Sequence, residues 1–249
     1  MSNGELVRIP GKKHLSYYEL IRNSAVYAFS DKVAILIFGI ILIVLSNLEN
    51  YILVSQDALL SKRILLVGII VVVLTIFEAG YSFKIKEETL RGSKRPPLFN
   101  HFKEMFRHGL KDFIIDLAYL LLMVLLIVIS IIGSALYKEY SMILPLLALF
   151  FITILTLIQQ SAIINLAYHD GEFKSAFDFK QIYRLMHAVG FKRMVVIFIL
   201  WFICDYLILT SIFHEGIFVE NTIFTFCLNL VITPFITIFT ERLFMLSTL

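Results

Sequence analysis

The sequence predicts an all-α integral membrane protein with about six transmembrane helices, arranged as three repeats with both termini in the cytoplasm. Three observations support this fold class. Of the 249 residues, 59% are hydrophobic and only 16% are charged, whereas soluble domains carry about 25% charged residues. Several apolar runs approach the roughly 20 residues that a helix needs to cross a bilayer. The basic residues are distributed unevenly between the segments that join these runs.

The expected spans alternate with short connections and longer polar segments. They cover residues 33–54, 64–83, 113–137, 142–168, 194–213 and 217–240. Glu49 and Asn50 interrupt the first run, so its continuous apolar part is short. Pro234 is expected to kink the last span, because proline removes a hydrogen bond from the helix interior.

Lysine and arginine collect in the cytoplasmic loops of membrane proteins, so their distribution predicts the orientation of the chain. Of the 22 such residues, only Lys62, Arg63 and Lys138 lie in the connections after the first and third spans. All the others lie before the first span, after the second, after the fourth or after the last. This distribution predicts a multi-pass protein of the cell membrane with cytoplasmic termini.

Each longer polar segment contains an amphipathic helix, with hydrophobic residues three or four positions apart. The three hydrophobic faces are Leu15, Tyr18, Ile21, Ala25 and Phe29; Leu98, Phe99, Phe102, Met105, Phe106, Leu110 and Phe113; and Phe179, Ile182, Leu185, Met186 and Val189. Basic amphipathic helices of this kind lie in the membrane interface. We therefore expect the lipid bilayer and its anionic headgroups as partners. The alternative is that these helices pack as cytoplasmic turns beneath the bundle.

The three amphipathic segments also share a sequence pattern. Residues 17–22 (YYELIR), 102–107 (FKEMFR) and 179–184 (FKQIYR) each read aromatic, any residue, Glu or Gln, apolar, apolar or aromatic, Arg. Each copy precedes two expected spans. The pattern predicts a single membrane domain over residues 1–249, built from repeat units near 1–83, 84–168 and 169–249.

Polar residues inside the spans are candidate functional residues, because an ionisable group in hydrocarbon is costly and usually has a role. Asp205 is the deepest, and the last span carries Thr225, Asn229 and Thr233 on one helical face. We expect Asp205, with its carboxyl protonated, to hydrogen-bond Asn229 or a threonine of that face. This cluster either joins helices or lines a path for protons or cations.

A second polar group lies in the cytoplasmic third of the spans. It comprises Glu78, Asp116, Gln159, Gln160 and Asn165. Snorkelling, capping and helix packing account for polar residues at such depths. The alternative is a polar vestibule open to the cytoplasm.

Catalytic and metal-binding patterns are absent from the sequence, which has no nucleotide-binding glycine loop, zinc-protease motif or hydrolase motif. Cys204 and Cys227 both lie in apolar runs and lack ligand spacing. We therefore expect no enzymatic activity, cofactor, metal or nucleic-acid partner. A homo-oligomer is compatible with the sequence.

Several loop motifs resemble a known family. They are Ala28 to Asp31 (AFSD), Gly80-Tyr81 with Ile85-Lys86, Gly92 with Pro97-Leu98-Phe99, Phe106 to Lys111 (FRHGLK) and Tyr168 to Phe177 (YHDGEFKSAF). Over residues 16–240 the chain resembles the archaeal multi-pass family known as domain of unknown function 4013. This sequence has Asp31-Lys32 where that family usually has Asp-Pro. The layout is also similar to the membrane domain of bacterial glycerophosphodiester phosphodiesterases. The resemblance implies a fold and a membrane location, but no activity.

Two functions remain as expectations. The favoured one is a non-enzymatic membrane scaffold or regulator whose amphipathic helices grip the cytoplasmic leaflet. The alternative is a transporter or channel for a small solute or ion, with a polar path along Asp205 and the Thr/Asn face of the last span.

Overall fold

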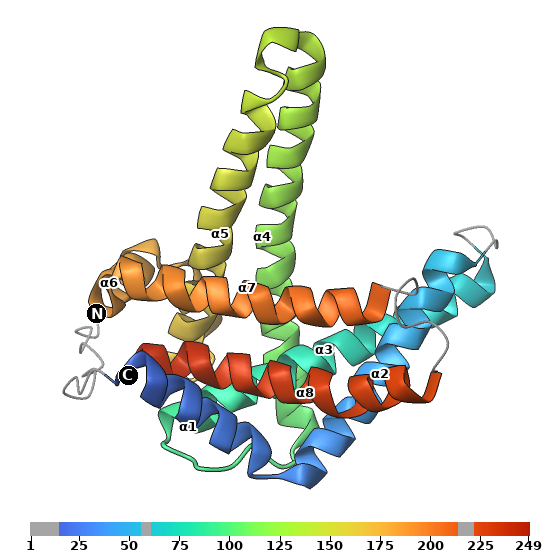
Figure 1. Cartoon of the computed structure of the whole chain (residues 1–249), viewed down its shortest axis with the longest axis vertical. Coiled ribbons are helices and arrows are strands. Elements are labelled where there is room, and N and C mark those ends of the chain that lie inside the picture. The colour runs from blue at the N-terminus through green and yellow to red at the C-terminus, as the bar shows by residue number, and fades with distance from the viewer. Residues whose placement is uncertain (1–14, 56–60, 214–221) are drawn as a thin grey trace. The chain divides into compact units, whose positions relative to one another are not determined.

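The computed structural model describes residues 15–55, 61–213 and 222–249, and in this part of the chain the fold is helical without strands (Figure 1). Side chains at 205, 207–213, 222–225 and 227–229 lie outside this description. The α-helices are α1 (Tyr17–Phe29), α2 (Lys32–Val54), α3 (Lys62–Leu90), α4 (Phe102–Leu136), α5 (Ile143–Tyr168), α6 (Phe179–Val189), α7 (Phe191–Phe213) and α8 (Thr222–Ser247). Two short 3-10 helices, η1 (Lys138–Tyr140) and η2 (Phe173–Phe177), complete the elements. The all-α class is confirmed.

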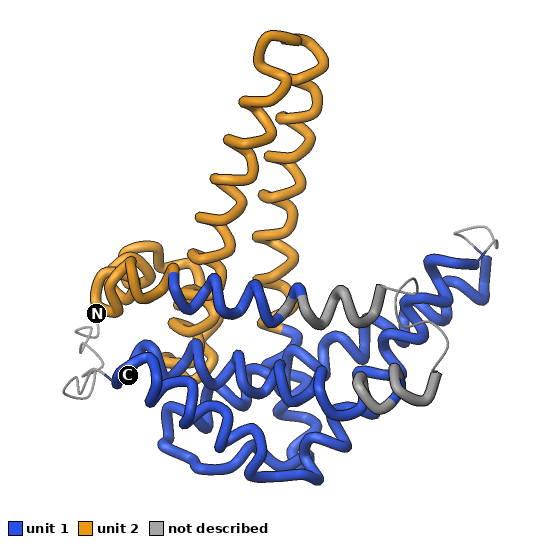
Figure 2. The backbone as a smooth tube through the Cα atoms, in the orientation of Figure 1, with its two compact units in different colours: residues 1–110, 196–249 blue, residues 111–195 orange. Residues whose placement is uncertain are grey.

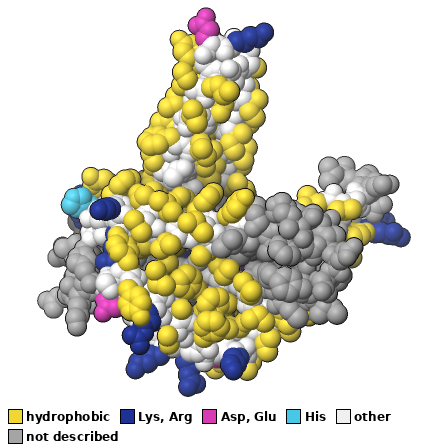
Figure 3. Space-filling view, in the orientation of Figure 1, with side chains coloured by type: hydrophobic (Ala, Val, Ile, Leu, Met, Phe, Trp, Pro, Cys, Tyr) yellow, Lys and Arg dark blue, Asp and Glu magenta, His cyan; other side chains and the backbone are white. Residues whose placement is uncertain are grey.

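Five helices are long and apolar enough to cross a membrane: α2, α3, α4, α5 and, over Leu230–Ser247, α8. A sixth candidate combines α6 with Phe191–Cys204 of α7, two segments that are bent by 90° relative to each other. Figure 3 shows hydrophobic side chains covering the flanks of the α4–α5 hairpin, with charged side chains at its tip. The described residues therefore confirm the expected multi-pass architecture with five to six spans.

Polar caps fix where several helices begin. Ser16 and Glu19 form a capping box at α1, in which the Glu19 carboxylate accepts from the Ser16 backbone N–H at 2.8 Å. Asp31 starts α2 by accepting from two backbone N–H groups at 3.0 Å each. Asp178 caps α6 in the same way. At these helices the caps satisfy backbone donors that would otherwise lack partners.

Three helices extend well beyond the sequence-based expectation, and one of them is α8, which continues past the expected end at residue 240 to Ser247. α3 does not end with the apolar run at Phe83 but continues to Leu90, because no glycine or proline lies between Phe83 and Gly92. There the backbone turns left-handed, with a φ of 76°, and the N–H of Ser93 bonds the carbonyl of Glu88. α4 unites the expected amphipathic segment and the expected third span in one helix of 35 residues.

The chain forms two compact units (Figure 2). Unit 1 comprises residues 1–110 and 196–249, and unit 2 comprises residues 111–195. The boundaries fall inside α4 and inside α7.

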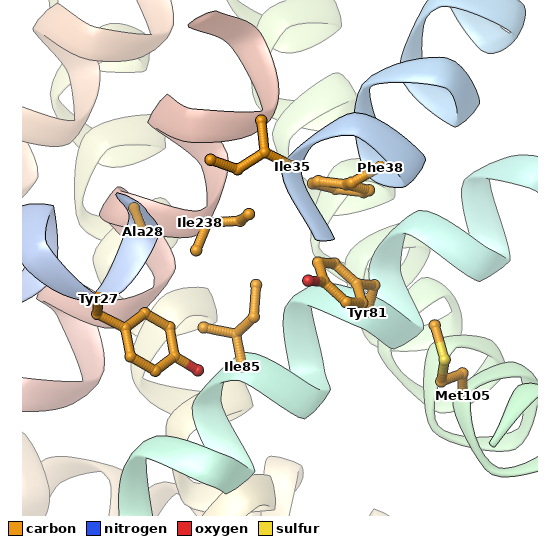
Figure 4. Packing of buried hydrophobic residues seen from close by; sticks show 8 residues of the cluster. All are labelled: Tyr27, Ala28, Ile35, Phe38, Tyr81, Ile85, Met105 and Ile238. Atoms are coloured by element: carbon orange, nitrogen blue, oxygen red, sulfur yellow. The ribbon is translucent and has the colours of Figure 1, made fainter. Parts of the chain in front are cut away.

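The core of unit 1 lies where α1, α2, α3 and α8 meet, with the first turn of α4 beside them (Figure 4). Its buried residues are Tyr27, Ala28, Ile35, Phe38, Tyr81, Ile85, Met105 and Ile238. Aromatic contacts join the elements. The ring of Tyr81 lies 4.7 Å from that of Phe38 and stacks on Phe99 at 4.2 Å. This packing holds the last turns of α3 against its neighbours.

Two helix crossings in unit 1 are close enough to require glycine. A Cβ on Gly80 of α3 would lie 2.0 Å from the Met105 carbonyl oxygen, and a Cβ on Gly109 of α4 would lie 1.9 Å from that of Ile76. A Cβ on Gly39 of α2 would similarly meet the backbone of Leu230 in α8. Small residues allow this backbone approach in membrane bundles, where dispersion forces rather than hydrophobic burial hold helices together.

Unit 2 contains α4 from Lys111 onward and α5, with η2 and α6 packed at the C-terminal end of α5. Asn165 donates from its side chain to the Ser175 carbonyl at 2.7 Å, and Lys111 donates to the Gly171 carbonyl at 2.5 Å. These bonds fix the turn through Asp170 and Gly171, both of which have positive φ. The loop between α5 and α6 is therefore held to the hairpin by polar contacts.

The glycine crossing predicts a selective loss of stability. Gly80→Ala and Gly109→Ala should each lower the free energy of unfolding by roughly 1–3 kcal/mol, because the new methyl group meets backbone atoms that cannot repack. Thermal unfolding of the purified protein in detergent measures this. Gly68→Ala in the same helix α3 is the matched control, since nothing lies within 4 Å of its Cβ. Equal effects at positions 68 and 80 would contradict the close crossing.

Candidate functional site

Charged side chains gather in the last two turns of α3, beyond its apolar run. Lys86 is 2% exposed, and Lys84, Glu87 and Thr89 are also buried. A charge that leaves water is destabilising unless an opposite charge or hydrogen bonds replace the lost hydration. The partners of these side chains therefore determine what the cluster does.

Two ion pairs join α3 to neighbouring helices of unit 1. The Lys84 ammonium lies 2.9 Å from a carboxylate oxygen of Glu104 in α4 and 3.2 Å from one of Glu87. The Lys86 ammonium lies 2.6 Å from a carboxylate oxygen of Glu241 in α8. Each lysine thus ties α3 to a different helix.

Arg242 completes the cluster from α8. Its guanidinium donates to the Thr89 hydroxyl at 2.8 Å and lies over the Tyr27 ring of α1, 4.1 Å from the centroid. Burial raises the pKa of the Tyr27 hydroxyl above its ordinary value, against the opposing effect of Arg242. Tyr27 therefore stays neutral at physiological pH and offers the cation its aromatic face.

The cluster is balanced in charge. Its cations are Lys84, Lys86, Arg91 and Arg242, and its carboxylates are Glu87, Glu88, Glu104 and Glu241. The carboxylates pair with cations of the protein, and Arg242 is held by Thr89 and Tyr27. We refer to this set, with Thr89 and Tyr27, as the ion network. Such an arrangement fixes how α1, α3, α4 and α8 meet rather than presenting one reactive group.

The ion network was not predicted from the sequence. Lys84 and Lys86 were counted among the basic residues after the second span, and Lys86 was also part of a family motif. The ion pairs of these lysines and the roles of Glu241 and Arg242 were missed. One signal was available: no glycine or proline separates Phe83 from Gly92, so the charged run continues the helix. The partners on α4 and α8 come from tertiary packing, which no local pattern reveals.

The predicted intramembrane cluster falls largely outside the described side chains. The side chains of Asp205, Thr225 and Asn229 are among those that are not described. Thr233 is described and is buried. Further along the same face, the Thr237 and Thr240 hydroxyls donate to carbonyls of α8 itself. Serine and threonine hydroxyls in membrane helices often meet their hydrogen-bonding requirement by donating to a carbonyl of their own helix.

Two of the predicted cytoplasmic-side polar residues contact each other within unit 2. Asp116 of α4 accepts a hydrogen bond from the Gln159 amide of α5 at 2.7 Å. Asn165 secures the loop after α5, and Gln160 is half-buried in the same helix. Glu78 is half-buried in unit 1, whereas the other four belong to unit 2. The structure thus joins Asp116 and Gln159 directly.

Helices of spanning length, close glycine crossings and a buried ion network define a multi-pass α-helical membrane protein. The chain belongs to the family described as "Protein of unknown function (DUF4013)", whose model matches residues 64–219. The family resemblance found in the sequence is thereby confirmed. No curated protein and no solved structure matches the chain.

The ion network predicts a strong effect at Lys86 and a weak one at Arg91. Lys86→Met should lower the free energy of unfolding by roughly 3 kcal/mol, because Glu241 loses its buried partner. Arg91→Met should cost under about 1 kcal/mol, since its side chain is 57% exposed. Chemical denaturation in detergent measures both variants.

The double variant Lys86→Met/Glu241→Gln tests the pair itself. It should be more stable than Lys86→Met, because the uncompensated carboxylate is gone. Purely additive losses would show that Lys86 and Glu241 are not coupled.

Proposed function

We propose that this protein is a non-enzymatic scaffold or regulator of the cell membrane, with cytoplasmic termini and with α1, the start of α4 and α6 seated in the cytoplasmic leaflet. One observation carries the proposal. The shared six-residue pattern occupies the first six positions of a helix in all three copies, and each copy turns the same positions outward.

The three copies begin at Tyr17, Phe102 and Phe179, which are the first residues of α1, α4 and α6. The fourth position of the pattern is buried each time, and its exposed fraction is 0% at Leu20, 2% at Met105 and 1% at Ile182. The first, second and sixth positions are exposed in all three helices. This agreement supports the predicted threefold repeat.

The outward faces are apolar and aromatic. Exposed side chains are Tyr17, Tyr18, Ile21 and Phe29 on α1; Phe102 and Leu110 on α4; and Phe179 and Tyr183 on α6. The hydrophobic face expected for α6 differs in part, because Ile182, Leu185 and Val189 pack inside unit 2. Tyrosine favours the membrane–water interface, where its ring contacts lipid and its hydroxyl contacts water. Phenylalanine and leucine are typical of the apolar face of an interfacial helix. The exposed faces therefore suit the interfacial interpretation.

The geometry of α6 also supports an interfacial position. Gly190 follows α6 with a φ of 90°, and the next helical segment leaves at 90° to it. A helix that turns by this angle before a candidate span can lie along the membrane surface while the span crosses it. Gly190 permits the turn because glycine lacks a Cβ and therefore adopts a positive φ without the steric cost that other residues have.

The ion network favours a structural role, in which it fixes the packing of the helices, over a catalytic role. Its charged groups contact one another or a hydroxyl and an aromatic ring of the protein. Buried networks of this kind specify how elements meet. A scaffold needs such a fixed arrangement, whereas a catalytic site needs a group aimed at a substrate.

The depth of the outward faces tests the proposal. Cys204 and Cys227 are replaced by serine, and single cysteines at Tyr18, Phe102 or Tyr183 carry an environment-sensitive fluorophore in reconstituted vesicles. Lipids with quenchers at the headgroup and along the acyl chain should quench all three positions most strongly from the headgroup boundary.

Two control positions mark the deepest and the most water-exposed quenching expected. Leu125, exposed in the middle of α4, should be quenched most strongly by deep quenchers. Lys94, exposed after α3, should respond only to aqueous quenchers. Fluorophores at Tyr18 and Tyr183 that behave like the one at Lys94 would overturn the proposed interfacial seating.

The competing function, a transporter or channel, depends on Asp205 in α7. A scaffold predicts that proteoliposomes with wild-type protein or with Asp205→Asn leak protons and small cations at the same rate as empty vesicles. Flux above that background that the Asp205→Asn variant lowers tenfold or more would favour a conducting path instead.

A further inference from the structure

The basic side chains of this protein fall into two groups by what they contact. Lys84, Lys86 and Arg242 are buried and engaged within the ion network. Arg22, Arg107 and Arg184, which close the three copies of the shared pattern, are exposed. Among the described residues, these three arginines form no hydrogen bond and no ion pair.

Two of these arginines lie one turn after an exposed lysine. Lys103 precedes Arg107 by four residues in α4, and Lys180 precedes Arg184 by four residues in α6. Residues four apart share a helix face, and two like charges there repel each other. An anion held between them would remove this repulsion.

The nearby acidic side chain of α4 is not available to balance its pair. Glu104 follows Lys103 directly, but its carboxylate is bound to the Lys84 ammonium at 2.9 Å. In α6 the corresponding position is the neutral Gln181, and the Asp178 carboxylate caps the helix. Among residues 15–55, 61–213 and 222–249, neither basic pair has an acidic partner on its own helix face.

Each basic pair is bordered by exposed apolar surface. Phe102 is 56% exposed directly before Lys103, and Phe179 is 62% exposed directly before Lys180. Tyr183, next to Arg184, is also exposed. A ligand that satisfies both features carries a phosphate for the cations and hydrocarbon for the aromatic rings.

We infer that the pairs Lys103–Arg107 and Lys180–Arg184 are two binding sites for the phosphate of anionic membrane lipids. The inference rests on the proposed interfacial position of α4 and α6 and names their partner. The arginine offers a planar fork of donors to the phosphate oxygens, and the lysine supplies a second charge. α1 has Tyr18 in place of the lysine, so Arg22 holds such a lipid more weakly.

Native mass spectrometry of the full-length protein with added phosphatidylglycerol tests this inference. The wild-type protein should bind one such lipid per basic pair, and phosphatidylcholine should not replace it. Lys103→Gln/Arg107→Gln and Lys180→Gln/Arg184→Gln should each remove one lipid, with Kd raised roughly thirtyfold at that site. Lys94→Gln/Arg95→Gln loses the same charge from an exposed loop and should bind as the wild type does.

Three outcomes would overturn the inference. The first is unchanged phosphatidylglycerol binding when both pairs are replaced. The second is an equal loss in the loop control, which would indicate a general effect of net charge. The third is displacement of the lipid by excess inorganic phosphate, which would indicate a site for soluble anions. Interfacial depth measured by fluorophores at Phe102 and Tyr183 separates this failure from failure of the proposed function, because depth does not require a bound phosphate.

Discussion

The Lys86–Glu241 ion pair is the interaction on which the packing of unit 1 depends most. Lys86 is buried, so the helix pair α3–α8 is stable only in the register that brings Glu241 to it. That register places Arg242 over Tyr27 and beside Thr89, which brings in α1. The close approach of Gly80 and Gly109 then sets the distance of α4, within reach of the Lys84–Glu104 pair. Electrostatics selects the register and glycine sets the spacing.

The sequence predicted those features that depend on local composition. Apolar runs predicted spans that match α2 and α5 closely, because helix formation in lipid follows from hydropathy and backbone satisfaction. The ends of α3 and α4 were misjudged, since hydropathy marks where lipid contact ends and not where the helix ends. The ion network was missed because Lys86 and Glu241 are far apart in sequence. Asp116 was predicted as a polar candidate, but its bond to Gln159 required the structure.

The repeat pattern gains meaning from the helix boundaries. Its third position serves a different purpose in each copy: Glu19 caps α1, Glu104 enters the ion network, and Gln181 is uncharged. Its fourth position is buried in all three. A repeated unit can keep its buried fourth position while its polar positions take different roles. Close packing restricts the size and shape of a buried side chain, whereas an exposed side chain has no such restriction. The exposed basic positions of the pattern, Arg22, Arg107 and Arg184, do not take part in packing inside the protein.

The Gly80–Gly109 contact also limits how such a chain can drift over evolutionary time. Each glycine faces the backbone of the opposite helix, so neither position can accept a larger residue while the other helix stays where it is. Substitution at one site would require the helices to separate, which would in turn loosen the aromatic stack beside them. In an alignment of relatives that share this packing, the two columns should be invariant together, whereas the column of Gly68 should vary freely.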